Sequence, residues 1–305
     1  MTYDILIVGG GAAGLTAATY ARRAGKSVLV IEKAAFGGQI TWSPRVENFP
    51  GSISVSGAEL GDKFLEQAME QGAEVALEEV VRAEECAEGF RLCCDSGEEF
   101  FGKALIVATG AKPRRLGLAH EEELIGSGVC FCAVCDGAFY KNRVVAVCGG
   151  GNSALQDALL LSEKSAKVYL IHRRNSFKGE ARLVEELAGR DNVEFLLNAR
   201  LTALRGEEEL TGVTVECEGK SFELALDGLF VAVGHAPDNA VFKELIALDE
   251  QGYAASGEDC ETVTPGVFVA GDCRRKKVRQ LTTACADGAA AALAACEWLG
   301  SRPSA

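Results

Sequence analysis

Two stretches of the chain carry the same order of apolar runs and glycine turns. Residues 4–32 align without a gap on residues 144–172, at a constant offset of 140 positions. In each copy an apolar run ends in three glycines, a helical stretch follows, and a second apolar run closes the unit. Strands buried in a parallel sheet read as continuous apolar runs, so each copy predicts a strand–helix–strand unit.

A second pair of segments matches in the same way. Residues 104–110 and 228–234 are apolar runs that end in glycine. Polar, proline-marked segments at 112–115 and 237–239 are typical of crossings between domains. The residues after the second crossing are too few for a third domain, so we expect them to return to the first.

These patterns predict an α/β fold with two Rossmann-like nucleotide-binding domains of the three-layer ββα type. The first domain is expected to be discontinuous, at residues 1–115 and 241–305. The second domain, at residues 116–240, is expected to be inserted in it.

The first glycine turn has the spacing of a dinucleotide site. Gly9, Gly11 and Gly14 form G-x-G-x-x-G, in which the glycines allow a tight turn, close approach of a pyrophosphate, and close helix–strand packing, in that order. The phosphates would lie at the helix N-terminus. Glu32 ends the next strand, where a carboxylate can accept hydrogen bonds from ribose hydroxyls. A purely structural turn is the alternative, and the motif alone does not separate FAD from NAD.

The second glycine turn differs where it would meet the ribose. It reads Gly149, Gly151 and Ala154, and its second strand ends in His172-Arg173-Arg174 in place of an acid. A carboxylate there would repel a 2′-phosphate, whereas arginines can clamp it with charge-assisted hydrogen bonds. The pattern favours NADPH over NADH; an arginine pair on a solvated turn is the alternative.

A cysteine pair precedes the second copy. Cys132-Ala-Val-Cys135 can form a redox disulfide or half of a metal site, and Cys130 extends it to C-x-C-x-x-C. No second C-x-x-C or H-x-x-x-H completes a tetrahedral site in the sequence, so a redox disulfide fed by the nucleotide units is favoured. Asp136 follows at once and could supply the proton that thiolate–disulfide exchange requires.

Charge and composition narrow the function classes. The net charge of −13 argues against a nucleic-acid surface, and the basic cluster at 274–277 reads as a solvated turn. The apolar run at 289–296 is too short to span a bilayer. No secretory signal is visible at the N-terminus, so a cytoplasmic location is expected, in which most of the twelve cysteines would be reduced thiols.

Five motifs in order resemble those of the low-molecular-weight thioredoxin reductases, flavoproteins of the pyridine nucleotide-disulfide oxidoreductase family. The likeness runs over essentially the whole chain. The motifs are Gly-Gly-Gln-Ile at 37–40 with Val-Glu-Asn-Phe-Pro-Gly at 46–51, Cys132-Ala-Val-Cys135-Asp136-Gly137, Gly-Gly-Gly-Asn-Ser-Ala at 149–154, His-Arg-Arg-Asn-Ser-Phe at 172–177, and Gly-Val-Phe-Val-Ala-Gly-Asp at 266–272 with Arg279-Gln280.

The resemblance implies that NADPH reduces FAD, which reduces the cysteine pair, which reduces thioredoxin. Cys135 would face the flavin, Cys132 would attack the partner, and Asp136 would be the acid/base. The family also implies a homodimer and a large rotation of the NADPH domain. The implied FAD residues are Gly9, Gly11, Ala12, Ala13, Gly14, Glu32, Gly38, Gln39, Asn48, Gly271, Asp272, Arg279, Gln280 and Leu281. The implied NADPH residues are Gly149, Gly151, Asn152, Ser153, His172, Arg173, Arg174 and Lys178.

Three positions depart from the family pattern. Lys178 stands where a further arginine is usual, Cys130 is an extra thiol, and Gln156 stands where an acid is common. Two other functions stay open at this point: a related flavoenzyme that uses ferredoxin as donor or a partner other than thioredoxin, and a non-catalytic flavin- or metal-binding regulator. An intact NADPH motif argues against the ferredoxin-fed enzyme, and the intact cysteine pair argues against the regulator.

Overall fold

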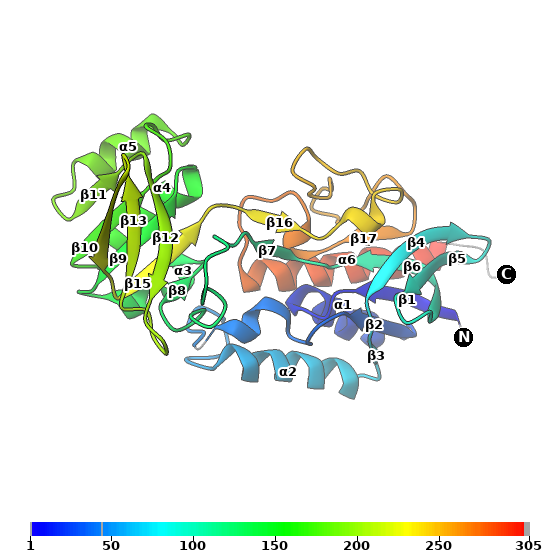
Figure 1. Ribbon diagram of the computed structural model, residues 1–305. Helices are drawn as coiled ribbons and strands as arrows, with labels where there is room; N and C mark the ends of the chain where they lie inside the picture. The colour runs from blue at the N-terminus through cyan, green and yellow to red at the C-terminus, as the bar shows by residue number, and fades with distance from the viewer. Residues whose placement is uncertain (1, 44, 302–305) are drawn as a thin grey trace. The chain divides into compact units, whose positions relative to one another are not determined.

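The chain divides into two compact units. The computed structural model describes residues 2–43 and 45–301. Unit 1 comprises Met1–Lys112 and Ala236–Ala305, and unit 2 comprises Pro113–His235. The cuts fall at or beside the two polar, proline-marked segments. The chain crosses between the units on β7 (Ala111–Pro113) and β16 (His235–Pro237), which pair as a two-stranded sheet (Figure 1).

Unit 1 is built on a seven-stranded sheet in the order β3-β2-β1-β6-β5-β4, with β17 also paired to β6. Strands β3, β2, β1, β6 and β17 run parallel, and β4 and β5 are antiparallel. The strands are β1 Thr2–Val8, β2 Val28–Glu32, β3 Glu74–Leu77, β4 Val80–Cys86, β5 Gly89–Cys94, β6 Glu99–Val107 and β17 Val267–Val269. Since β17 comes from the second segment, the end of the chain completes the sheet.

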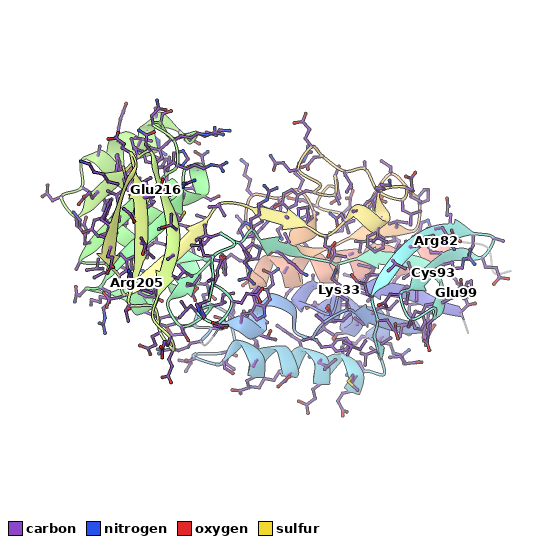
Figure 2. The ribbon with its side chains drawn as sticks, in the orientation of Figure 1. Lys33, Arg82, Cys93, Glu99, Arg205 and Glu216 are labelled. Atoms are coloured by element: carbon purple, nitrogen blue, oxygen red, sulfur yellow. A yellow bond between two sulfur atoms is a disulfide. The ribbon has the colours of Figure 1, made fainter. Side chains whose placement is uncertain are left out.

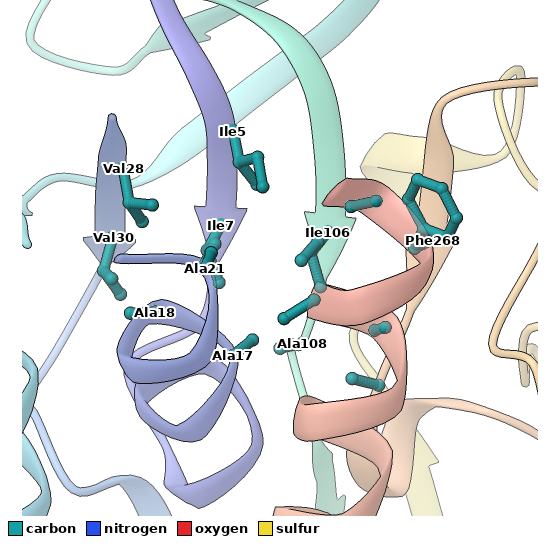
Figure 3. Packing of buried hydrophobic residues seen from close by; sticks show 14 of the residues in the cluster. Ile5, Ile7, Ala17, Ala18, Ala21, Val28, Val30, Ile106, Ala108 and Phe268 are labelled. Carbon is teal, nitrogen blue, oxygen red and sulfur yellow. The ribbon is translucent and has the colours of Figure 1, made fainter. Parts of the chain in front are cut away.

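Helices of unit 1 pack on one face of its sheet. They are α1 Ala12–Arg23, α2 Gly57–Glu70 and α6 Leu281–Ser301. The unit also has short 3-10 turns, η1 Gly38–Trp42, η3 Ala240–Phe242 and η4 Gly271–Cys273, of which η3 packs on the opposite face through Phe242. Ile5 and Ile7 of β1 point to these helices, whereas Leu6 between them belongs to the core on the opposite face (Figure 3). This alternation follows the two-residue period of a strand. Within the described residues no helix is long and apolar enough to cross a membrane.

Alanines let α1 lie close to the sheet. Ala17, Ala18 and Ala21 are fully buried and face the apolar side chains of the sheet (Figure 3). Small side chains cost little rotamer entropy and allow close helix–sheet packing. The glycine-rich start of α1 is thereby held against the sheet.

Unit 2 has three layers. A parallel five-stranded sheet, in the order β11-β10-β9-β15-β8, carries three helices on one face and the antiparallel sheet β12-β13-β14 on the other. Val145 and Val147 of β9 pack toward the helices, and Ala146 packs toward the small sheet. The elements are β8 Val129–Cys130, α3 Ala133–Asp136, η2 Gly137–Tyr140, β9 Val144–Gly149, α4 Asn152–Ser162, β10 Lys167–Ile171, α5 Ala181–Ala188, β11 Val193–Leu196, β12 Ala199–Arg205, β13 Gly212–Cys217, β14 Lys220–Ala225 and β15 Gly228–Ala232.

The internal repeat predicted from the sequence is confirmed. Helices α1 and α4 begin at positions that differ by 140, and each is preceded by a glycine with extended backbone. The first strand of each copy also pairs with one of the two apolar segments that match each other in the sequence, β1 with β6 and β9 with β15. The α/β fold with two Rossmann-like units is therefore confirmed.

Ion pairs lie on the surfaces of both units. Arg200 pairs with Glu216 at 3.0 Å on the β12-β13-β14 sheet, where Figure 2 shows Glu216 and Arg205. In unit 1, Lys33, which Figure 2 labels, contacts Glu79 at 3.2 Å and Asp238 at 2.5 Å. The second contact joins the second segment of the unit to the first. Exposed pairs of this kind contribute less than about 1 kcal/mol each.

Candidate active site and nucleotide sites

Packing requires glycine at two positions of the first turn, whereas a third position is open. A Cβ at Gly9 would lie under 3.0 Å from the Ala108 carbonyl oxygen, and Gly9 has a φ of +112°. A Cβ at Gly14 would lie even closer to the Gly9 carbonyl oxygen. At Gly11, by contrast, no protein atom would lie nearer than 3.9 Å to a Cβ. The backbone at Gly11 is therefore open, as a site that admits a pyrophosphate must be.

Glu32 lies at the open turn, and its carboxylate can accept more hydrogen bonds than the backbone donates to it. Its Oε2 accepts from the Gly10 N–H at 2.7 Å and its Oε1 from the Ala34 N–H at 2.9 Å. Each carboxylate oxygen can accept a further hydrogen bond. The carboxylate is thus held in place by the backbone and can still receive ribose hydroxyls.

Asp272 presents an unsatisfied acceptor beside this turn. A Cβ at the preceding Gly271 would lie 2.8 Å from the Ala13 Cβ, so the start of η4 packs directly on α1. The Asp272 Oδ1 is buried and has no hydrogen-bond partner among the described residues, and burial raises the pKa of Asp272. A buried acceptor without a partner is costly. This oxygen, which lies 3.9 Å from Lys276 Nζ, can accept a hydrogen bond from a bound molecule.

Asp287 on α6 holds the segment that carries Asp272. It accepts from the Gly271 N–H at 3.1 Å, from Arg274 Nε and Nη2 at 2.9 Å each, and from Lys276 Nζ at 2.8 Å. The side chains of Arg274 and Lys276 are only 12% and 8% exposed. The prediction that residues 274–277 form a solvated turn is therefore wrong for these two, because the alternate positions turn inward to a buried carboxylate.

Other predicted FAD residues lie in the same unit. Gln39 Nε2 donates to the Ala111 carbonyl at 3.0 Å, and Asn48 Nδ2 donates to Gln280 Oε1 at 3.5 Å. The Arg279 guanidinium lies 4.3 Å from the centre of the Tyr253 ring. Gly38 begins η1, Ala12 begins α1 and Leu281 begins α6. All fourteen predicted FAD residues thus belong to unit 1.

The second turn repeats the geometry of the first. A Cβ at Gly149 would lie under 3.0 Å from the Ala232 carbonyl oxygen, whereas a Cβ at Gly151 would meet nothing within 4 Å. Ala154 is fully buried where the first copy has its third glycine. In the second turn, therefore, protein atoms fill the space beside Gly149, whereas the space beside Gly151 is open.

The side chains around the second turn carry positive charge. Arg173, Arg174 and Lys178 are exposed, and the Lys178 N–H donates to the Gly150 carbonyl at 2.7 Å. Asn152 is tied to Glu180, whose N–H donates to Asn152 Oδ1 at 2.8 Å, and Ser153 is exposed on the first turn of α4.

His172 lies over this turn as a neutral ring. It stacks on Phe177 at 5.4 Å, and its Nε2 is buried without a hydrogen-bond partner in the described structure. Burial, with the nearby charges of Arg174 and Arg173, lowers the pKa of His172.

The cysteine pair is bonded. Cys132 and Cys135 form a disulfide with Cα atoms 5.3 Å apart. Cys132 is the N-cap of α3, and the Cys135 N–H donates to Cys132 Sγ at 3.1 Å. Hydrogen bonding to a sulfur favours its thiolate form. The ten other cysteines are free, as the sequence predicted for most of them.

Asp136 is the ionisable group next to the disulfide. Burial raises the pKa of Asp136 to about 6, and a hydrogen bond from Cys130 opposes that shift. A carboxyl group with a pKa near neutrality can both hold and release a proton under physiological conditions. The sequence did not indicate that Cys130 and Tyr140 line this carboxyl group, because a two-residue strand and a 3-10 turn leave no periodic signal.

A bonded C-x-x-C pair beside a half-buried carboxyl group, in a chain with two glycine turns of the dinucleotide-binding type, defines a nucleotide-dependent oxidoreductase of dithiols and disulfides. The chain belongs to the pyridine nucleotide-disulphide oxidoreductase family, which matches residues 3–288, and within it to the low-molecular-weight thioredoxin reductases.

Relatives cover nearly the whole chain. The thioredoxin reductase of Listeria monocytogenes is 39% identical over 292 residues, which are 94% of this chain and 90% of that protein. The thioredoxin reductase of Bacillus subtilis is 38% identical over 296 residues, which are 95% of this chain and 92% of that protein. The crystal structure of thioredoxin reductase from Streptococcus pyogenes superposes with a TM-score of 0.93 at 35% identity, over 99% of both chains.

Proposed function

We propose that this protein reduces thioredoxin with electrons from NADPH, using FAD in unit 1 and the Cys132–Cys135 disulfide in unit 2. The bonded pair with a titratable carboxyl group beside it is the observation that carries the proposal. When bound, FAD accepts a hydride from NADPH and supplies two electrons to the disulfide.

The residues of unit 1 fit FAD. The open backbone at Gly11 would receive the pyrophosphate and Glu32 the ribose hydroxyls. The Oδ1 of Asp272, which accepts no hydrogen bond from the described residues, would accept one from a ribityl hydroxyl. Gln39, Asn48 and Gln280 would lie near the flavin ring, as the family resemblance implies.

The residues of unit 2 fit NADPH. The open backbone at Gly151 would receive its pyrophosphate. Exposed guanidinium groups of Arg173 and Arg174 would clamp the 2′-phosphate, with Lys178 as a third positive charge. His172, kept neutral by burial, places no negative charge against that phosphate.

Cys132 is the attacking sulfur in this mechanism. Its thiolate would receive the Cys135 N–H hydrogen bond, which stabilises the negative charge. The thiolate attacks one sulfur of the oxidised partner, so that a mixed disulfide forms and a partner thiolate leaves. Cys135 then attacks Cys132 Sγ, which releases the reduced partner and restores the internal disulfide.

Asp136 supplies protons to these exchanges. Its carboxyl group, with a pKa raised by burial to about 6, donates a proton to a leaving thiolate and recovers it from an incoming thiol. The leaving thiolate is then less able to reverse the step.

Two further parts of the proposal concern assembly, which rests on the family resemblance, and location. We expect the protein to act as a homodimer and in the cytoplasm, where thioredoxin is reduced. Sedimentation of the FAD-loaded protein would measure the first.

The test is an anaerobic titration that follows flavin absorbance near 450 nm. NADPH is expected to bleach the flavin, NADH to do so at higher concentration, and oxidised thioredoxin to restore the colour. The variant Cys135→Ser should bind FAD and be bleached by NADPH, yet reduce no thioredoxin. Cys296→Ser, which changes a free thiol on α6 of unit 1, is the matched control.

Two outcomes would contradict the proposal. If the Cys135→Ser variant reduced thioredoxin at the parent rate, the assigned redox centre would be wrong. If neither pyridine nucleotide bleached the bound flavin, reduced ferredoxin would become the donor to test.

A further inference from the structure

Asn239 is a fully buried polar residue at the point where the chain returns to unit 1. It is 1% exposed and follows the crossing strand β16 by two residues. Its Nδ2 donates to the Cys273 carbonyl at 2.8 Å and to the Gly252 carbonyl at 2.9 Å. Its Oδ1 accepts from the Thr109 hydroxyl at 2.9 Å. Both amide hydrogens and the amide oxygen therefore have partners within unit 1.

The hydroxyl group of Thr109 completes this arrangement. Thr109 lies two residues before the outgoing crossing strand β7 and is 130 residues from Asn239 in the sequence. The nitrogen of the Asn239 amide must face the two carbonyl groups, because a carbonyl oxygen can only accept. The amide oxygen then needs a donor, which Thr109 supplies. One hydroxyl group before the outgoing crossing thus satisfies a side chain that follows the returning one.

The contact with Cys273 fixes the turn that carries Asp272. Cys273 directly follows Asp272 in η4, and its carbonyl also accepts from the Ala254 N–H at 3.0 Å. On the other side of Asp272, the Gly271 N–H donates to Asp287 Oδ2 at 3.1 Å. Side chains from two distant segments therefore hold the backbone immediately before and immediately after Asp272.

Asp272 needs such anchors because its Oδ1 has no hydrogen-bond partner among the described residues. That oxygen is buried, and Lys276 Nζ, 3.9 Å away, is too distant for a hydrogen bond. A buried acceptor without a partner is costly, so a turn that is free to move would carry the oxygen to a donor such as water. A costly position of this kind persists only where the surrounding structure fixes it. The two anchors thus keep the oxygen in place for a bound molecule.

We propose that Asn239 is a positioning residue for the FAD site: through the Cys273 carbonyl it holds the η4 turn, so that Asp272 stays in place for the ribityl chain. This role rests on the proposed function, which assigns that chain to Asp272. A binding group that is held in place before its ligand arrives lowers the free-energy cost of binding. Loss of the anchor should therefore weaken FAD binding in a protein that still folds.

The experiment measures the Kd for FAD of the full-length protein by equilibrium dialysis. Asn239→Leu removes both donors and keeps a side chain of similar size, and its Kd should be about 3- to 10-fold higher than that of the parent. In Thr109→Val the amide oxygen of Asn239 loses its donor, and the Kd should rise about 2- to 3-fold. Thr109→Ser keeps the hydroxyl group and should bind FAD as tightly as the parent.

A destabilising change elsewhere in unit 1 is the matched control. Leu92 on β5 is fully buried in the core on the sheet face opposite α1, and truncation of a core leucine is strongly destabilising. Leu92→Ala should therefore lower the urea midpoint at least as much as Asn239→Leu and leave the Kd for FAD unchanged. If Asn239→Leu fails to fold, Thr109→Val and Thr109→Ser carry the test.

The visible circular dichroism of bound flavin, recorded at saturating FAD, is a second readout. It reports how the protein holds the flavin and does not depend on the amount of FAD bound at lower concentrations. The spectrum should change in Asn239→Leu and Thr109→Val and should match the parent spectrum in Leu92→Ala and Thr109→Ser.

The outcomes separate this inference from the proposed function. If Asn239→Leu and Thr109→Val bind FAD as tightly as the parent, or if Leu92→Ala weakens FAD binding as much as they do, the positioning role is wrong even where thioredoxin is reduced normally. A parent protein that binds no FAD would contradict both proposals. Weaker FAD binding in Asn239→Leu and Thr109→Val alone, in a protein whose parent reduces no thioredoxin, would support the role of Asn239 and contradict the proposed function.

Discussion

Replacing Gly151 by alanine should separate nucleotide binding from folding. Gly151 has a φ of −97° and a ψ of −179°, which alanine adopts without strain, and a Cβ there would meet nothing within 4 Å. The smaller entropy of the unfolded chain favours alanine by about 0.4–1 kcal/mol, while alanine is a poorer N-cap than glycine by a similar amount. The free energy of unfolding should therefore stay within about 1 kcal/mol of the parent value.

Binding of NADPH should suffer instead. The added methyl group projects into the open space through which a pyrophosphate reaches the backbone N–H groups of the turn. One lost charge-assisted hydrogen bond costs about 1.5–3 kcal/mol, which raises the Kd for NADPH about 10- to 150-fold. Titration calorimetry on the oxidised protein measures this Kd, and urea unfolding measures the stability.

Gly149→Ala is the matched control two residues earlier. Its Cβ would lie under 3.0 Å from the Ala232 carbonyl oxygen, so the strand must move. Stability should fall by about 1–3 kcal/mol. A Gly151→Ala protein that is folded and binds NADPH as tightly as the parent would refute the assignment of this turn.

Two further changes test the charges of each unit. The double variant Arg173→Gln/Arg174→Gln should lower kcat/KM for NADPH by about 10- to 100-fold and leave kcat/KM for NADH within twofold of the parent value. The reason is that only NADPH carries the 2′-phosphate. An equal loss with both nucleotides would contradict this prediction. Asp287→Asn should lower the free energy of unfolding by about 3–5 kcal/mol at pH 7, because Arg274 and Lys276 stay buried without their anion. Burial alone would raise the pKa of Asp287, but hydrogen bonds from Arg274 and Lys276 outweigh it and lower the pKa below 3.8. The contribution of Asp287 to folding stability is therefore fully present above that pH. It is lost as the pH falls through the lower pKa of the folded state. Urea unfolding at pH 7 and pH 3 measures the loss of stability. The control is Glu216→Gln at an exposed ion pair, which should cost less than about 1 kcal/mol. Equal effects of the two variants would contradict the role of the buried network.

The strand–helix–strand units could be predicted because their signals are local. Apolar runs, glycine turns and the offset of 140 fix where β1, α1 and β2 lie and where β9, α4 and β10 repeat them. The return of the C-terminal segment could be inferred from its length, but not its place in the sheet. Strand β17 has three residues, and its pairing with β6 depends on contacts distant in sequence.

The buried charge network was not predictable for a related reason. Arg274 and Lys276 lie in a run of four basic residues, which on sequence alone suggests solvent. Their partner Asp287 is thirteen and eleven residues away, inside an alanine-rich helix. The pairing is set by the packing of α6 on η4, and no period in the sequence reports it.

The glycines show another limit of prediction from the sequence. Gly9 and Gly11 are the same letter in the motif, yet the first is required by a carbonyl of the neighbouring strand and the second by nothing in the protein. A sequence pattern cannot tell a glycine kept for packing from one kept for a ligand. The structure distinguishes their surroundings, because an added Cβ would collide with the protein at Gly9 and would meet open space at Gly11.

The two copies of the unit diverge at the residue that ends their second strand. In the first copy Glu32 accepts the Gly10 N–H at 2.7 Å, so the turn is closed by a carboxylate with free acceptor capacity. In the second copy the ring of His172 lies so close to Gly150 that a Cβ there would be under 3.0 Å away. Burial and the neighbouring arginines keep that ring neutral. The same backbone turn therefore carries a carboxylate acceptor in unit 1 and, in unit 2, a histidine ring with the exposed Arg173 and Arg174 next to it in sequence.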